Sequence, residues 1–91
     1  MAKNNRNIAL AWYRQDQWQL LLDYSTDSDK LEHTYQEWLE HAEEKVNDMD
    51  TDGINVIKVG INIEEMKKWC ERHKKPIDGH TRSEYAVFLA Q

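Results

Sequence analysis

Three aspartates at alternate positions directly precede a glycine: Asp48, Asp50 and Asp52 lead to Gly53. This spacing matches the opening of an EF-hand loop, and carboxylates suit calcium, which takes about six to eight oxygen ligands. The rest of the loop does not match, because the closing position, where a glutamate normally binds calcium, is Val59. The same residues also fit an acidic helix end followed by a glycine stop. Cation binding through this acidic loop is therefore an alternative function, and we assign no metal ligand.

Cys70 and His73 stand three positions apart in the segment W-C-E-R-H. On a helix they could share a metal ion or form a thiolate–imidazole pair. Zinc would need two further ligands, and the remaining histidines are not paired in spacing with any other ligand: His33, His41 and His80. A catalytic thiol would need a positioned base and an oxyanion hole, and no glycine-rich turn precedes Cys70. Because cysteine is often buried and Met66 shares its helical face, we expect a structural thiol and keep a thiol-dependent enzyme as a minor alternative.

Other signatures of catalysis do not occur in the sequence. It contains no nucleophile elbow, phosphate-binding loop, dinucleotide fingerprint, zinc-protease motif or paired-cysteine motif. The adjacent glutamates Glu43–Glu44 and Glu64–Glu65 would point about 100° apart on a helix, so neither pair forms a site. We therefore predict no catalytic residue and no cofactor.

Charge is distributed unevenly along this chain, whose net charge is −5. Residues 23–52 hold eleven acids and two bases, a balance of −9, whereas residues 67–82 hold six bases and two acids, a balance of +4. The basic segment includes Trp69, a composition found in nucleic-acid contacts. Overall acidity disfavours a phosphate backbone, so we expect no nucleic-acid partner. The asymmetry instead permits protein contacts, including weak, salt-sensitive self-association.

The acidic loop lies within the most strongly patterned stretch of the chain, Thr34–Ile61. Apolar residues recur there at helical spacing and form one stripe: Tyr35, Trp38, Leu39, Ala42, Val46 and Met49. Thr34 and Glu37 have the spacing of a capping box, and Gly53 can end the helix in a left-handed conformation. The β-branched run Ile54–Ile61 then predicts a strand. We expect Trp38, Leu39, Ala42 and Val46 to be buried.

The other elements follow from similar patterns. We expect a strand covered on both faces at 7–13, a helix at 15–25, a helix at 63–73 capped by Asn62, and a helix from Asp78 to about Leu89. Their inner faces are predicted to be Trp18, Leu21 and Leu22; Ile63, Met66, Trp69 and Cys70; and Tyr85, Phe88 and Leu89. Residues 1–6 carry no pattern and are expected to be disordered.

The predicted order is β-α-α-β-α-α, and we expect one small α/β domain spanning the 91 residues. Two strands joined through a pair of helices favour a parallel, two-stranded sheet packed by four helices. Such a sheet is marginal by itself, so it needs helices to cover it or a second chain to extend it.

Three stretches are similar to short hypothetical bacterial proteins of about this length: A-W-Y-R-Q-D-Q-W, T-Y-Q-E-W-L and K-K-W-C-E-R-H-K-K-P-I-D-G. The resemblance covers most of the chain, from Ile8 to Leu89. It implies a small, stand-alone bacterial protein, and it transfers no activity, ligand or functional residue.

A non-catalytic protein–protein interaction domain is the function that these observations favour. The single Cys70 cannot form an internal disulfide, so no oxidising compartment is required. The longest apolar run, Ile8–Tyr13, is too short to cross a membrane. We therefore expect a cytoplasmic protein with an unknown protein partner and no membrane contact.

Overall fold

The computed structural model describes residues 6–91, and these form two strands and four α-helices. In chain order they are β1 (Asn7–Trp12), α1 (Trp18–Tyr24), α2 (Tyr35–Thr51), β2 (Asn55–Gly60), α3 (Ile63–Arg72) and α4 (Gly79–Ala90). Short 3-10 turns occur at η1 (Gln15–Gln17) and η2 (Ser28–Lys30). The predicted order and the mixed α/β class are confirmed. The expectation of a disordered start covers residues 1–6, of which 1–5 lie outside the described residues. The carbonyl of Arg6 accepts a hydrogen bond from the Asn55 N–H at 2.8 Å. None of the helices in residues 6–91 is both long and apolar enough to cross a membrane.

Local sequence signals fix both ends of α2, the long helix. The Thr34 hydroxyl accepts a hydrogen bond from the Glu37 N–H (3.1 Å), and the Glu37 carboxylate accepts one from the Thr34 N–H (3.3 Å). At the other end Gly53 has a φ of +80°, which glycine adopts without steric cost. The N–H of Ile54 then reaches back to the Met49 carbonyl at 2.9 Å, closing the helix with a Schellman turn. The predicted capping box and glycine stop are confirmed.

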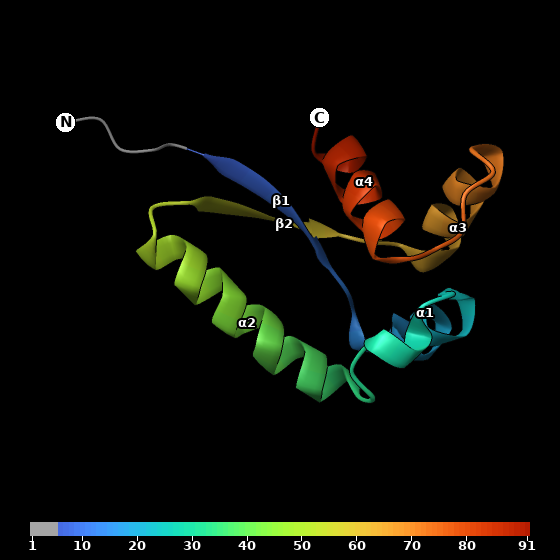
Figure 1. Ribbon diagram of the computed structural model, residues 1–91, viewed down its shortest axis with the longest axis horizontal. Coiled ribbons are helices and arrows are strands. Elements are labelled where there is room, and N and C mark those ends of the chain that lie inside the picture. The colour runs from blue at the N-terminus through green and yellow to red at the C-terminus, as the bar shows by residue number, and fades with distance from the viewer. Residues whose placement is uncertain (1–5) are drawn as a thin grey trace.

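The two strands pair in parallel, as predicted, with Asn7 opposite Asn55 and Trp12 opposite Gly60. The sheet has no third strand among the described residues. Figure 1 shows α2 on one side of the sheet and α4 on the other, with α1 and α3 gathered at one end. Trp12 packs against Trp38 of α2, with 5.2 Å between the ring centroids. Successive side chains of a strand point to opposite faces of the sheet, so the side chain of the neighbouring Ala11 points toward α4.

The core lies where α1, α3 and α4 meet the ends of the two strands. Its buried residues are Tyr13, Trp18, Leu21, Ile61, Ile63, Met66, Trp69, Cys70, Ile77 and Tyr85. The predicted inner face of α3 is confirmed in full, since all four of its residues are buried. In α1, Trp18 and Leu21 are buried and Leu22 is half-buried.

Burial along α2 differs from the prediction. Of the four residues expected in the core, Ala42 is buried, whereas Trp38, Leu39 and Val46 are half-buried. The physical reason is that the sheet is narrow. The helix α2 has 17 residues, and a sheet of two strands cannot cover the whole of its apolar stripe.

Burial in two other elements also differs from the prediction. The strand expected to be covered on both faces has α2 on one side and α4 on the other, but it is only half-buried from Ile8 to Trp12, because its outer edge is open. On α4, Tyr85 is buried as predicted, but Phe88 and Leu89 are 51% and 41% exposed. Phe88 packs along one side against Trp69 of α3 (5.7 Å between ring centroids), and its opposite side faces solvent.

Candidate functional site

The outer edge of β1 carries backbone groups without partners. In a parallel pair, alternate residues of a strand direct both their N–H and their C=O toward the neighbouring strand. The N–H of Asn55 binds the Arg6 carbonyl (2.8 Å) and that of Ile61 binds the Trp12 carbonyl (3.2 Å). The even-numbered residues of β1 therefore face β2, and Ala9 and Ala11 direct their N–H and C=O groups outward. Within residues 6–91, no other segment hydrogen-bonds to the backbone of these two alanines.

A groove of about 280 Å³ runs along this open edge. Ala9, Leu10 and Ala11 form its base. One wall comes from α2 and includes Trp38, His41, Ala42 and Lys45, and the other comes from the start of α4 and includes Gly79, Arg82 and Ser83. Figure 1 views this edge directly, with β1 in front of β2 and a helix on either side. We call this feature the β1 groove.

Small side chains on two elements leave the space that the groove occupies. On the side that faces α4, β1 presents alanines at positions 9 and 11, and the first turns of α4 present Gly79 and Ser83. Larger residues at these four positions would fill the gap between strand and helix. The groove therefore depends on side-chain size as well as on the missing third strand.

An ion pair fixes the α4 wall in place. The two terminal nitrogens of Arg82 donate to the two carboxylate oxygens of Asp27 at 2.8 and 2.9 Å, and one of them also donates to the Ser25 hydroxyl at 3.2 Å. The side chains of Arg82 and Asp27 are 10% and 19% exposed. The hydrogen bond from Arg82 holds the pKa of Asp27 below its usual value. Because α4 and the loop before α2 share this pair, the position of the wall depends on it.

Tyr13, at the end of β1, is enclosed beside the same ion pair. Burial of its hydroxyl raises the pKa of Tyr13 to about 12, although nearby Arg82 acts in the opposite direction. The phenol is therefore neutral at physiological pH. Its backbone carbonyl accepts a hydrogen bond from the Tyr35 hydroxyl at 3.0 Å, which ties the end of β1 to the start of α2.

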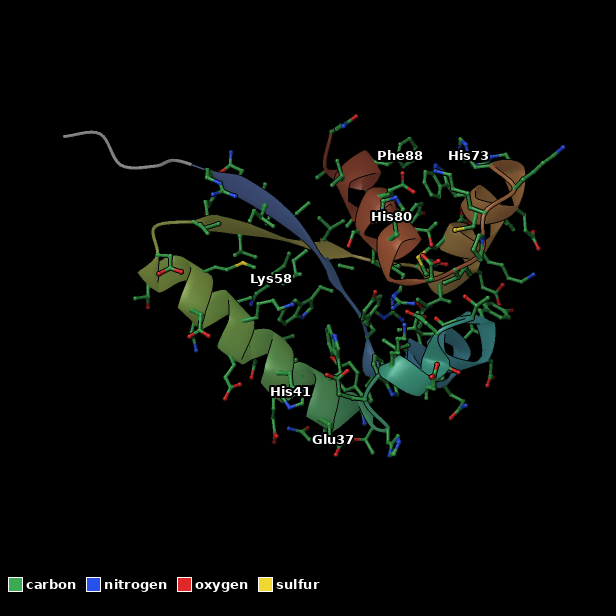
Figure 2. All side chains as sticks on the ribbon, in the orientation of Figure 1. Glu37, His41, Lys58, His73, His80 and Phe88 are labelled. Carbon is green, nitrogen blue, oxygen red and sulfur yellow. The ribbon has the colours of Figure 1, made fainter. Side chains whose placement is uncertain are left out.

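Glu32 lines the α2 side of the groove together with His41 and Lys45, and two further acids of α2 lie close to His41. His41 Nδ1 lies 2.8 Å from a carboxylate oxygen of Glu32, and both residues line the groove. The hydrogen bond to Glu32 raises the pKa of His41, and the negative charges of Glu44 and Glu37 raise it further. Figure 2 shows Glu37 and His41 on the same half of α2. Glu37 and Glu44 lie beside His41 without lining the groove themselves, and together with Glu32 we call them the acidic wall.

The acidic loop identified from the sequence is not a gathered site. Asp48 and Asp50 belong to α2, and Asp52 is the residue that caps it. Residues two positions apart on a helix point in different directions, so the helix separates the first two carboxylates. Among residues 6–91, no group of three or more potential ligands lies close enough to hold a metal ion.

Cys70 is enclosed in the core at 1% exposure, beside Met66 on α3. Burial raises the pKa of its thiol, although a hydrogen bond with Thr81 partly opposes the shift. His73, the possible partner of Cys70 in the minor thiol-dependent alternative, packs its ring against Trp69 at 4.6 Å between ring centroids. The burial of Cys70 agrees with the structural thiol that the sequence predicts.

A second, more open groove lies between α3 and α4. It has a volume of about 530 Å³ and is lined by Trp69, Val87 and Phe88, with His73 and His80 at its rim. Figure 2 shows both histidines and Phe88 in this region. Trp69, which the sequence placed among basic residues, is 8% exposed and therefore belongs to the core. Lys75 is paired with Glu84 at 3.0 Å.

Sequence reasoning did not identify the β1 groove. The alanines at positions 9 and 11 and the small residues Gly79 and Ser83 were the available signal. The two pairs lie about 70 residues apart in the chain, and small side chains have many other roles. The groove can therefore be recognised only once the fold is known.

Comparison of the chain with known protein families, with curated proteins and with solved structures finds no match.

Proposed function

We propose that this protein is a non-catalytic protein–protein interaction domain that receives an extended segment of its partner along β1. The observation that carries the proposal is the pair of outward-facing alanine backbones at the base of the β1 groove. An added strand would give these N–H and C=O groups hydrogen-bond partners, a mode of recognition known as β-augmentation. A third strand would also strengthen a sheet that has only two.

The alternative functions have less support. The helical placement of Asp48 and Asp50 separates the carboxylates that a calcium ion would need together. The burial of Cys70 works against thiol chemistry, because a reactive thiol must be both accessible and readily ionised. The resemblance to short bacterial proteins and the unpaired cysteine support a bacterial, cytoplasmic setting as part of the same proposal.

A pair of proline substitutions tests the proposal. Ala9→Pro removes an outward N–H from the β1 edge without removing a hydrogen bond to β2. Lys58→Pro is the matched control, because in the same ladder the N–H of Lys58 faces the outer edge of β2. Thermal unfolding of both variants would first verify that each is folded.

The wild type and the two variants would then be immobilised and exposed to an extract of the source cells. We expect proteins retained by the wild type to be retained by Lys58→Pro and lost by Ala9→Pro. Each such protein would be purified and mixed with the domain, and the Ala9 and Ala11 amides should then exchange with solvent more slowly. Equal retention by Ala9→Pro and Lys58→Pro would refute strand addition at β1.

A further inference from the structure

We infer that the segment received by the β1 groove is an extended one in which basic side chains alternate with apolar ones. This inference rests on the proposed function and specifies the chemistry of the partner. The base of the groove determines the backbone conformation, and its two unlike walls determine the side chains.

The base of the groove requires an extended partner. The free backbone groups belong to alternate residues, Ala9 and Ala11, which are about 6.5–7 Å apart along a strand. A strand offers N–H and C=O groups at the same repeat, so each alanine can form two hydrogen bonds with it. A helix cannot match this pattern, because its backbone groups are already paired internally.

The α4 wall favours apolar side chains of moderate size. Successive side chains of a strand point to opposite faces, so every second residue of the partner would face α4. There it would meet the methyl groups of Ala9 and Ala11 and the small residues Gly79 and Ser83. Arg82 lies in this wall as well, but Asp27 already neutralises its charge through two hydrogen bonds.

The α2 wall favours basic side chains. The residues of the partner that face α2 would lie near Glu32, Glu37 and Glu44, which surround His41. Lys45 also lines this wall, and it is the single lysine of a helix that carries six acidic residues. Lysine or arginine side chains are long enough to keep their apolar stems in the groove while their charges reach the acidic wall.

A second copy of the chain fits the groove less well. If two β1 strands paired about a twofold axis perpendicular to the sheet, both α2 helices would lie on the same face of the joined sheet. Two acidic walls would then face each other, and like charges repel. The charge of the groove therefore favours a different, basic chain.

Two short peptides with blocked ends test the inference by NMR on the isotope-labelled domain. One has the sequence Lys-Val-Lys-Val-Lys-Val-Lys, and the other has glutamate in place of each lysine. We expect the basic peptide at millimolar concentration to shift the Ala9 and Ala11 amides and to slow their exchange with solvent. The binding should weaken as salt rises from about 0.05 M to 0.5 M, because screening shortens the range of the attraction.

A charge-matched pair of variants locates the recognition. Glu37→Gln combined with Glu44→Gln removes two charges from the acidic wall, and glutamine can still complete the capping box. We expect about two- to thirty-fold weaker binding of the basic peptide, since each exposed ion pair contributes about 0.2–1 kcal/mol. Glu40→Gln combined with Glu43→Gln is the control, because it removes the same charge from positions of α2 that do not surround His41.

The outcomes separate the inference from the proposed function. Equal effects of the two peptides on Ala9 and Ala11 would refute the basic preference and leave strand addition intact. If neither peptide changed these amides, strand addition itself would be overturned. Slower exchange at Ala9 and Ala11 without peptide, together with a doubled mass in sedimentation, would identify a second copy as the occupant and overturn the inference.

Discussion

The ion pair between Arg82 and Asp27 gives the sharpest test of how the fold is held together. Asp27→Ala removes the carboxylate and leaves the guanidinium group of Arg82, 10% exposed, with its principal partner gone. It also removes an acceptor for the Gly79 N–H at the start of α4. The α4 wall of the β1 groove should therefore loosen together with the loop before α2.

The size of the effect follows from the burial of the pair. Removing one partner of a buried ion pair costs about 3–5 kcal/mol, because the remaining charge stays desolvated. Asp27 is 19% exposed, so water can partly replace it, and we expect a loss near the lower limit, about 3 kcal/mol. For a domain of this size each kcal/mol moves the melting temperature by about 4–8 °C, so the midpoint should fall by about 12–24 °C.

Thermal unfolding followed by circular dichroism at pH 7 would measure the change, with Asp29→Ala as the control. Asp29 is exposed in the same loop, so its removal should cost less than about 0.5 kcal/mol. The double variant Asp27→Ala and Arg82→Met should recover at least about half of the loss, because it leaves no buried charge unpaired. An Asp27→Ala variant as stable as Asp29→Ala would refute the structural role of the pair.

The same ion pair predicts a dependence on acid. The folded-state pKa of Asp27 is below the ordinary value of 3.8, so its contribution to stability is present above that value and is lost as pH falls through the folded-state pKa. The difference in stability between the wild type and Asp27→Ala should therefore shrink below about pH 3.8.

Two further predictions concern α2. Trp38→Ala should destabilise the fold by about 2–3 kcal/mol, less than the about 3–5 kcal/mol expected for a fully buried tryptophan, because Trp38 is only half-buried. Its ring nevertheless contacts four aromatic side chains, those of Trp12, Tyr13, Trp18 and Tyr35. Urea unfolding would measure the loss, and an unchanged midpoint would contradict the packing. Millimolar Ca²⁺ should leave the amide shifts of residues 48–55 unmoved, because α2 separates the carboxylates. Saturable shifts there, abolished in Asp50→Ala, would restore the cation-binding alternative.

Local sequence signals predicted the elements, because each depends on neighbours in the chain. Thr34 and Glu37 form their capping box within a single turn, and Gly53 closes the helix with residues of the preceding turn. The apolar stripe of α3 is also confirmed, because a helix of 10 residues can bury one whole face against α1 and α4.

Burial along α2 and β1 could not be predicted in the same way. The periodicity from Tyr35 to Met49 indicates which residues share one face of α2. How deeply that face is buried depends on how many strands of the sheet pack against it. The sequence around β1 does not indicate that β2 is the single strand that pairs with it. The groove could not be predicted for the same reason, since it requires an unpaired β1 edge and small residues on α4, which lies at the far end of the chain.

The open edge of β1 also has a consequence for the protein when it is alone. Unpaired strands can template the aggregation of other chains, and proteins commonly guard against this with a proline or a charged side chain within the strand. The segment from Asn7 to Trp12, N-I-A-L-A-W, has neither. Its protection against misassembly therefore falls to α2 and α4, which limit the approach of another sheet from either side. We therefore expect resistance to misassembly at this edge to depend on how the two helices are docked.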